Sequence, residues 1–166
     1  MRLSAEIRYD ADPAAVFAML TDEAFQKRKC AATGALESEV AIERFPDGGA
    51  TIRTVRTMPT DQVPDFARTF VGRTIDIVQT DDFGAPDPGG RREGTVVVEL
   101  RGAPIRFAGS LTLGPSPEGS VETLDGDIKA SVPIIGGRME KALEPALLAA
   151  IRVEQREGTA WLAGSR

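Results

Sequence analysis

Apolar and polar residues alternate at the start of the chain, and this alternation predicts a half-buried strand over residues 2–9. Its apolar face carries Leu3, Ala5, Ile7 and Tyr9. Two short helices are expected next. Asp12 followed by Pro13 is typical of an N-cap with proline at the first helical position. Asp22 and Gly34 mark the beginning and the end of the second helix.

Six further strands are predicted after these helices. The turn sequence PDGG at 46–49 joins two of them into a hairpin. The strands are expected within residues 35–45, 50–58, 73–83, 94–102, 105–115 and 119–132. Residues 59–72 interrupt this series with two prolines and a short amphipathic segment, and residues 84–93 form a polar loop tip.

The last part of the chain has apolar residues at helical spacing, which predicts one long helix from the glycine pair at 136–137 to about residue 162. The apolar stripe comprises Met139, Ala142, Leu143, Ala146, Leu147, Ala150, Ile151, Val153, Trp161 and Leu162. The opposite, solvent-facing side is expected to carry Arg138, Lys141, Glu144, Arg152 and Glu154. A kink is expected at Pro145, because proline removes one helical hydrogen bond. The kink could follow the curvature of a sheet or shape a cavity.

These elements predict an α+β fold in a single domain over residues 1–166. Seven strands and one unmatched long helix cannot bury their apolar faces separately. We therefore expect a curved antiparallel sheet of seven strands that grips the C-terminal helix, with the two short helices between the first and second strands.

Composition excludes several classes of function. The net charge of -5 argues against non-specific nucleic-acid binding. The chain has no histidine and one cysteine, Cys30, so a histidine-based triad, a histidine metal site, a cysteine cluster and an intrachain disulfide are ruled out. We therefore expect no metal and no cofactor. No integral membrane association is expected either, because no run of 18 apolar residues occurs. The charged, alternating N-terminus is not a signal peptide, so a cytoplasmic location is expected. The oligomeric state stays open.

Two segments carry a resemblance to a known superfamily. They are YDADPAAVFAMLTDEAFQKRK at 9–29 and VPIIGGRMEKAL at 132–143. With the order of elements, they make the chain similar to the START-like superfamily, also known as the helix-grip or polyketide cyclase/dehydrase and lipid-transport superfamily. Within it, the chain looks most similar to a family of uncharacterised bacterial proteins, a domain of unknown function. The resemblance implies a deep cavity between sheet and helix, which holds sterols, lipids, plant hormones or polyketide intermediates in other members.

Ten residues are predicted to line such a cavity, from strand alternation and the helix stripe. They are Arg56, Met58, Glu99, Phe107, Leu111, Leu124, Ile128, Met139, Leu143 and Leu147. A solid core needs the same residue types, so a filled interior remains an alternative. Arg56 and Glu99 are functional candidates only if they point inward, because a buried charge must be paired or neutralised. Strand glycines Gly109 and Gly126 indicate either sharp curvature or room for a ligand.

Three functions are compatible with the sequence. The first is binding or carriage of a hydrophobic small molecule, without catalytic residues. The second is a cyclase- or dehydrase-type enzyme, for which Tyr9, Asp76 and Glu99 are the acid–base candidates. The third is a protein-interaction module with a filled core. Cys30 is interpreted as a structural thiol, and the segment QKRK at 26–29 as a solvated helix face.

Overall fold

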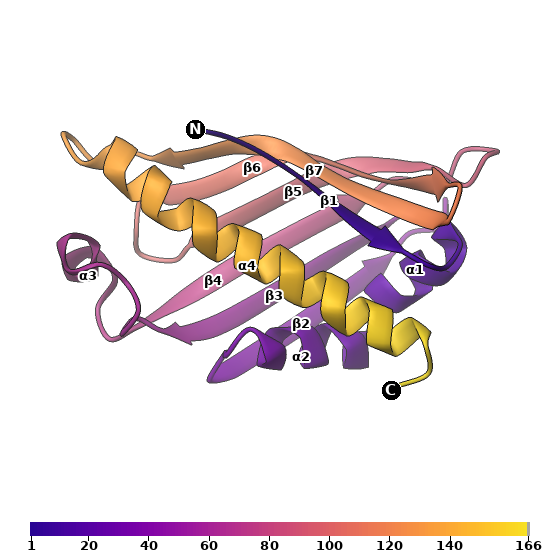
Figure 1. Ribbon diagram of the computed structural model, residues 1–166, viewed down its shortest axis with the longest axis horizontal. Coiled ribbons are helices and arrows are strands. Elements are labelled where there is room, and N and C mark those ends of the chain that lie inside the picture. Colours follow the sequence, from indigo (N-terminus) through magenta and orange to yellow (C-terminus); the bar gives the residue numbers. More distant parts are fainter. Residues whose placement is uncertain (166) are drawn as a thin grey trace.

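The computed structural model describes residues 1–165, which form seven strands and four helices (Figure 1). In chain order the elements are β1 (Arg2–Tyr9), α1 (Pro13–Leu20), α2 (Glu23–Ala32), β2 (Glu37–Arg44), β3 (Ala50–Pro59), α3 (Asp65–Val71), β4 (Thr74–Phe83), β5 (Arg92–Leu100), β6 (Ile105–Ser116), β7 (Gly119–Ala130) and α4 (Gly136–Leu162). The predicted fold class is confirmed, including the two short helices between the first two strands. The interruption at 59–72 contains the short helix α3.

The two short helices begin at the predicted caps. The Asp12 carboxylate accepts a hydrogen bond from the backbone N–H of Ala15 at 2.8 Å, and Pro13 is the first helical residue. The Asp22 carboxylate accepts from the backbone N–H of Ala24 in the same way, at 2.8 Å. These caps satisfy donors that the first turn of a helix leaves free.

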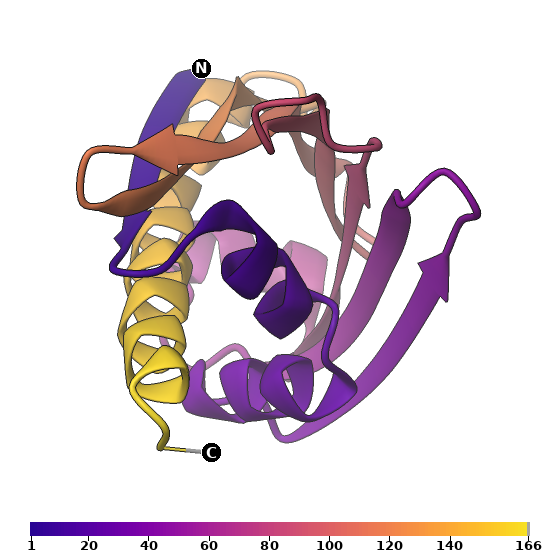
Figure 2. The ribbon, with the colours of Figure 1, turned by 90° about the vertical axis from the view of Figure 1, so that its right-hand side faces the viewer.

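The sheet is antiparallel throughout, with strand order β1-β7-β6-β5-β4-β3-β2. The strands β1 and β2 therefore lie at opposite edges, and α1 and α2 connect them. Figure 2 shows the sheet curving around α4, with α1 and α2 closing one end of the space between them. The concave face of the sheet and one side of α4 thus enclose the interior of the molecule.

Two glycines lie opposite each other where β6 and β7 approach closely. Gly109 pairs with Gly126 across the two strands. A Cβ added at Gly109 would lie 2.2 Å from the carbonyl oxygen of Asp125 and 2.5 Å from the Cα of Gly126. The proximity of the two backbones accounts for these glycines, as in sharply curved sheets.

The long helix α4 runs as one element from Gly136 to Leu162 and includes Pro145 (Figure 1). Pro145 is exposed, so the carbonyl of Lys141 that loses its helical partner can bind water instead. Near the C-terminal end the helix packs on α2 through Trp161, whose ring centroid lies 5.6 Å from that of Phe25. A Cβ added at Gly158 would come within 2.6 Å of the Tyr9 ring, so the helix sits close against β1.

Candidate functional site

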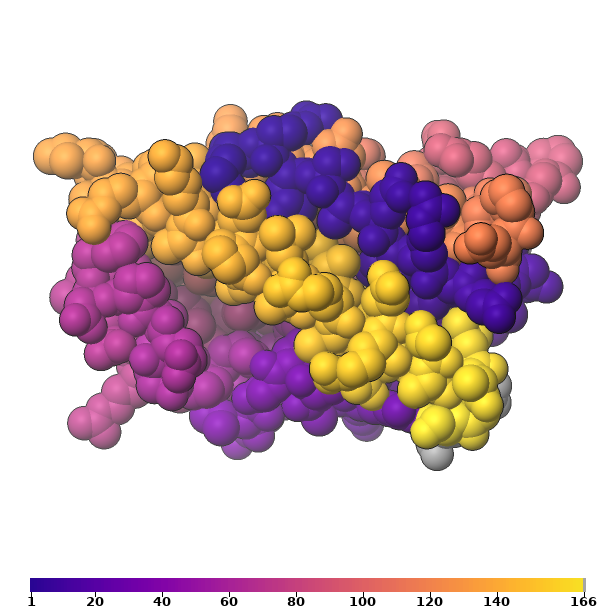
Figure 3. All heavy atoms as spheres, viewed as in Figure 1, coloured from indigo at the N-terminus to yellow at the C-terminus, as the bar shows by residue number. Residues whose placement is uncertain are grey.

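A hollow with almost wholly apolar walls opens between α3 and the first half of α4. It measures about 350 Å³, at the lower end of the roughly 300–1,000 Å³ typical of small-molecule sites. Met58 from β3, Ile105 from β6, and Met139 and Leu143 from α4 contribute to its wall. Figure 3 shows the corresponding recess on the surface between α3 and α4. We call this hollow the mouth.

A second, smaller hollow of about 40 Å³ lies deeper beneath α4. We call it the inner hollow. A narrow space of about 20 Å³ lies between the two. This space shares Phe107 and Leu147 with the inner hollow, and Ile105 and Leu143 with the mouth. The three spaces therefore lie in series along α4, and we call this series the trough. The mouth is apolar, whereas the inner hollow has four polar side chains among its mainly apolar walls, Lys29, Arg56, Gln79 and Glu154, and we also call it the polar end.

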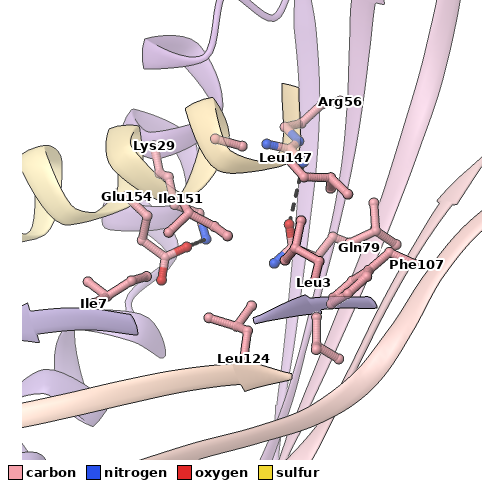
Figure 4. A pocket seen from close by; sticks show the side chains of 13 residues that line it. Leu3, Ile7, Lys29, Arg56, Gln79, Phe107, Leu124, Leu147, Ile151 and Glu154 are labelled. Atoms are coloured by element: carbon pink, nitrogen blue, oxygen red, sulfur yellow. Dashed lines mark hydrogen bonds and ion pairs between the residues drawn. The ribbon is translucent and has the colours of Figure 1, made fainter. Parts of the chain in front are cut away.

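The polar end contains a buried ion pair between α2 and α4 (Figure 4). Lys29 Nζ lies 2.8 Å from Glu154 Oε2, and the two side chains are only 5% and 13% exposed. Both residues line the inner hollow. Glu122 and Tyr9 lie close to the pair, and each has a buried oxygen without a hydrogen-bond partner among the described residues.

The second polar group of the inner hollow comes from β3 and β4. Arg56 is 6% exposed and donates one long hydrogen bond, 3.4 Å, to Gln79 Oε1. The amide nitrogen of Gln79 donates to both carboxylate oxygens of Asp81, at 3.1 and 2.9 Å. The Nε of Arg56 is buried and has no partner among the described residues. Arg56 and Gln79 line the hollow, whereas Asp81 lies behind them.

Burial changes the protonation of the acids in this region. Loss of hydration raises the pKa of Asp81 to about 6, although the nearby Lys29 opposes the rise. The pKa of Glu122 is raised well above its ordinary value, first by burial and then by the negative charges of Glu154 and Asp81. Burial therefore favours the protonated form of Glu122. Burial, followed by the charges of Glu154 and Glu122, also raises the pKa of the Tyr9 hydroxyl well above its ordinary value.

The structure brings eight of the ten predicted lining residues to this trough. Met58, Met139 and Leu143 line the mouth, and Arg56 and Leu124 line the inner hollow. The remaining three border the narrow space: Phe107, Ile128 and Leu147. Leu111 is 1% exposed and packs in the hydrophobic core without contacting any of the three spaces.

Glu99 lies on the outer face of the sheet, so its predicted place in the cavity does not match the structure. Its side chain is 54% exposed, and its carboxylate lies 3.8 Å from Nε of Arg106. Asp76 is also on the outer face, where it accepts hydrogen bonds from Thr57 and Arg101. Neither acid can reach the trough. Of the three acid–base candidates, only Tyr9 faces the interior.

Two charged residues of the site were expected in solvent but face the interior, where Lys29 is buried and Glu154 is largely covered. Lys29 belongs to the QKRK segment, and Glu154 was assigned to the polar side of the long helix. Glu154 nevertheless lies three positions after Ile151 and seven after Leu147, which is the spacing of the apolar stripe. Lys29 likewise lies four positions after buried Phe25. These spacings were signals that the charges could face inward.

Cys30 is fully buried, and burial raises the pKa of its thiol despite the neighbouring cations Arg56 and Lys29. A thiol in this environment is a poor nucleophile. Among residues 1–165, no group of three or more carboxylates and thiols has an arrangement that could hold a metal ion.

A curved antiparallel sheet closed by a long C-terminal helix defines a helix-grip fold. Residues 4–162 match the family model described as "Protein of unknown function (DUF2505)", and the chain belongs to this family. An uncharacterised protein of Mycobacterium tuberculosis strain H37Rv is 25% identical over 118 residues, which cover 70% of this chain and 67% of that protein. An uncharacterised protein of Mycobacterium bovis matches with the same values.

Solved structures have the same fold at low sequence identity. A STAR-related lipid transfer protein from Xanthomonas axonopodis has a TM-score of 0.60 and 16% identity, over 98% of this chain and 85% of that one. A protein from Rhodobacter sphaeroides has a TM-score of 0.59 and 22% identity, over 99% and 93% of the two chains. Within residues 1–165, none of the helices has the length and hydropathy needed to cross a membrane.

Proposed function

We propose that the protein binds or carries a hydrophobic small molecule, of lipid, sterol-like or polyketide type, in the trough between the sheet and α4. The observation that carries this proposal is the apolar mouth of about 350 Å³, which lies in series with the narrow space and the inner hollow along α4. Transfer of a ligand from water into such walls contributes about 0.8 kcal/mol for each buried methylene group. The lipid transfer protein with the same fold gives general support.

Native mass spectrometry of the purified protein tests this proposal directly, because a carrier is expected to retain a stoichiometric apolar adduct. A pair of variants then locates the ligand. Ala142 lines the mouth, whereas Ala149 lies on the exposed side of the same helix. Ala142→Phe should fill the mouth and abolish the adduct, and Ala149→Phe should leave it unchanged. An adduct that survives Ala142→Phe would place the ligand elsewhere.

The ionisable groups at the inner end support a second candidate, a cyclase- or dehydrase-type enzyme. Such a reaction needs a base and an acid within reach of the substrate, and Glu154 and Lys29 are the charged pair that faces the inner hollow. Binding is favoured over catalysis, because each of these groups already holds the other. If the protein is an enzyme, Glu154→Gln should abolish turnover of a bound polyketide and leave its binding intact. Product analysis by mass spectrometry would measure this turnover.

A further inference from the structure

The charge of Arg56 is not balanced at contact distance. Within the described residues, no carboxylate lies within 4.0 Å of its guanidinium, and its one hydrogen bond is the 3.4 Å contact to the neutral Gln79. A guanidinium has five N–H donors, and a buried charge is costly unless it is paired and hydrogen-bonded. The contrast with Lys29 is direct, because Lys29 has Glu154 at 2.8 Å.

The unpaired group faces the trough. Three ionisable residues line the inner hollow: Lys29, Arg56 and Glu154. Lys29 and Glu154 balance each other, so the positive charge of Arg56 has no counterpart among the residues that line the hollow. The carboxylate of Asp81, held by Gln79, acts on Arg56 only from behind this wall. Figure 4 shows the Arg56 side chain beside Gln79 and Leu147, across the hollow from the ion pair. Asp81 and Glu122 do not contribute to this wall.

The size of the inner hollow limits the group that can meet Arg56. A hollow needs roughly 10–15 Å³ to hold one water molecule, so 40 Å³ admits a group of about three non-hydrogen atoms. A carboxylate has that size and matches the planar fork of a guanidinium. A phosphodiester head group is too large. The mouth and the connecting space offer mainly apolar walls for the rest of the molecule.

We infer that the ligand of the trough is a medium-chain carboxylic acid, whose carboxylate binds Arg56 at the inner end while its hydrocarbon chain extends to the mouth. This inference rests on the proposed binding function and specifies its substrate class. Arg56 acts as the residue that determines specificity, and Met58, two positions along the same strand, lies beside the chain in the mouth.

Calorimetric titration of the full chain with three matched probes tests the inference: decanoate, 1-decanol and decyltrimethylammonium, each below its micelle concentration. The wild-type protein is expected to bind decanoate at least tenfold more tightly than 1-decanol, and the cation most weakly. Arg56→Met should remove the preference, so that decanoate and 1-decanol bind equally. Arg53→Met, an exposed position on the same strand, is the control and should keep it.

A measurement on the wild-type protein covers the case in which Arg56→Met does not fold. The carboxyl carbon of ¹³C-labelled decanoate reports its own protonation by NMR. A carboxylate held by Arg56 should titrate at a lower pH than free decanoate, because the guanidinium favours its charged form. Titration at the free value would overturn the assignment.

The outcomes separate the inference from the proposal beneath it. Equal binding of decanoate and 1-decanol by the wild-type protein refutes the role of Arg56 and leaves the hydrophobic carrier intact. Absence of binding for all three probes, together with no adduct in native mass spectrometry, refutes both.

Discussion

The buried pair of Lys29 and Glu154 makes a quantitative prediction for stability. At a separation of 2.8 Å, two unit charges attract by about 6 kcal/mol at an effective dielectric constant of about 20. The cost of removing both groups from water offsets much of this energy. Lys29→Met removes the attraction but leaves Glu154 buried, 13% exposed, beside other acids. Loss of one partner of such a pair costs about 3–5 kcal/mol.

We therefore expect Lys29→Met to lower the melting temperature by about 6–20 °C, given this loss of about 3–5 kcal/mol and roughly 2–4 °C per kcal/mol for a chain of this length. Urea unfolding followed by the fluorescence of Trp161 gives the free energy of unfolding, because this single tryptophan of α4 is buried against Phe25 of α2. The double variant Lys29→Met/Glu154→Leu should recover to within about 2 kcal/mol of the wild type, since no uncompensated charge remains at this position.

A neighbouring lysine provides the matched control. Lys27 pairs with Glu23 on the solvent side of the same helix, with both side chains more than half exposed. Lys27→Met should cost less than about 1 kcal/mol. If Lys29→Met were as mild as Lys27→Met, or if the double variant were no more stable than the single one, the pair would be solvated and the account of the polar end would be wrong.

Three further predictions concern other parts of the fold. The free energy of unfolding is expected to fall by up to about 3 kcal/mol as pH rises from about 4 to about 6, because Asp81 keeps its proton in this range in the folded state but not in the unfolded state. Asp81→Asn should remove this pH dependence, which urea unfolding at a series of pH values would measure. Ile134 has a φ of 71° and is fully exposed, so Ile134→Gly should relieve strain and raise stability by about 1 kcal/mol, which calorimetry can measure; a loss would contradict the strain. Gly109→Ala should lower the free energy of unfolding by more than about 3 kcal/mol, because the added Cβ would clash with the backbone of β7. Gly137→Ala has open space around its Cβ and should leave stability unchanged or raise it; thermal unfolding of both variants gives the comparison.

The fold was predictable because its elements follow strong local patterns. Strict alternation along β1 and the apolar stripe of α4 each determine one face, and the caps Asp12 and Asp22 fix where the short helices begin. Such patterns depend on neighbours within a few residues, so they can be recognised without knowledge of the tertiary structure.

The polar end of the trough was much harder to predict from the sequence, because it is built from the same residue types as a solvated surface. In β4 the inner face contains both Ile77 and Gln79, and alternation alone could not show which face is buried. Lys29 and Glu154 lie 125 residues apart in the sequence. A charged residue is expected to be exposed unless its partner is known, and the sequence does not show this pairing. The prediction for Glu99 was wrong for the opposite reason: the residue follows a run of valines in β5, which suggested an interior position, but its side chain faces outward.

The composition of the interior fits the proposed binding role of the polar end. Apolar residues of similar volume in place of buried charges are often neutral or stabilising by about 1–4 kcal/mol, so folding alone would not require Lys29, Arg56, Asp81, Glu122 and Glu154 beneath α4. Arg56 is the most telling of these, because no acid compensates it within contact distance in the described chain. If Arg56 is held for a carboxylate, Arg56→Met should leave the free protein as stable as the wild type or more so, and should lose the additional stability that saturating decanoate gives the wild type. A purely structural arginine predicts the reverse, a less stable free protein with an unchanged response to decanoate.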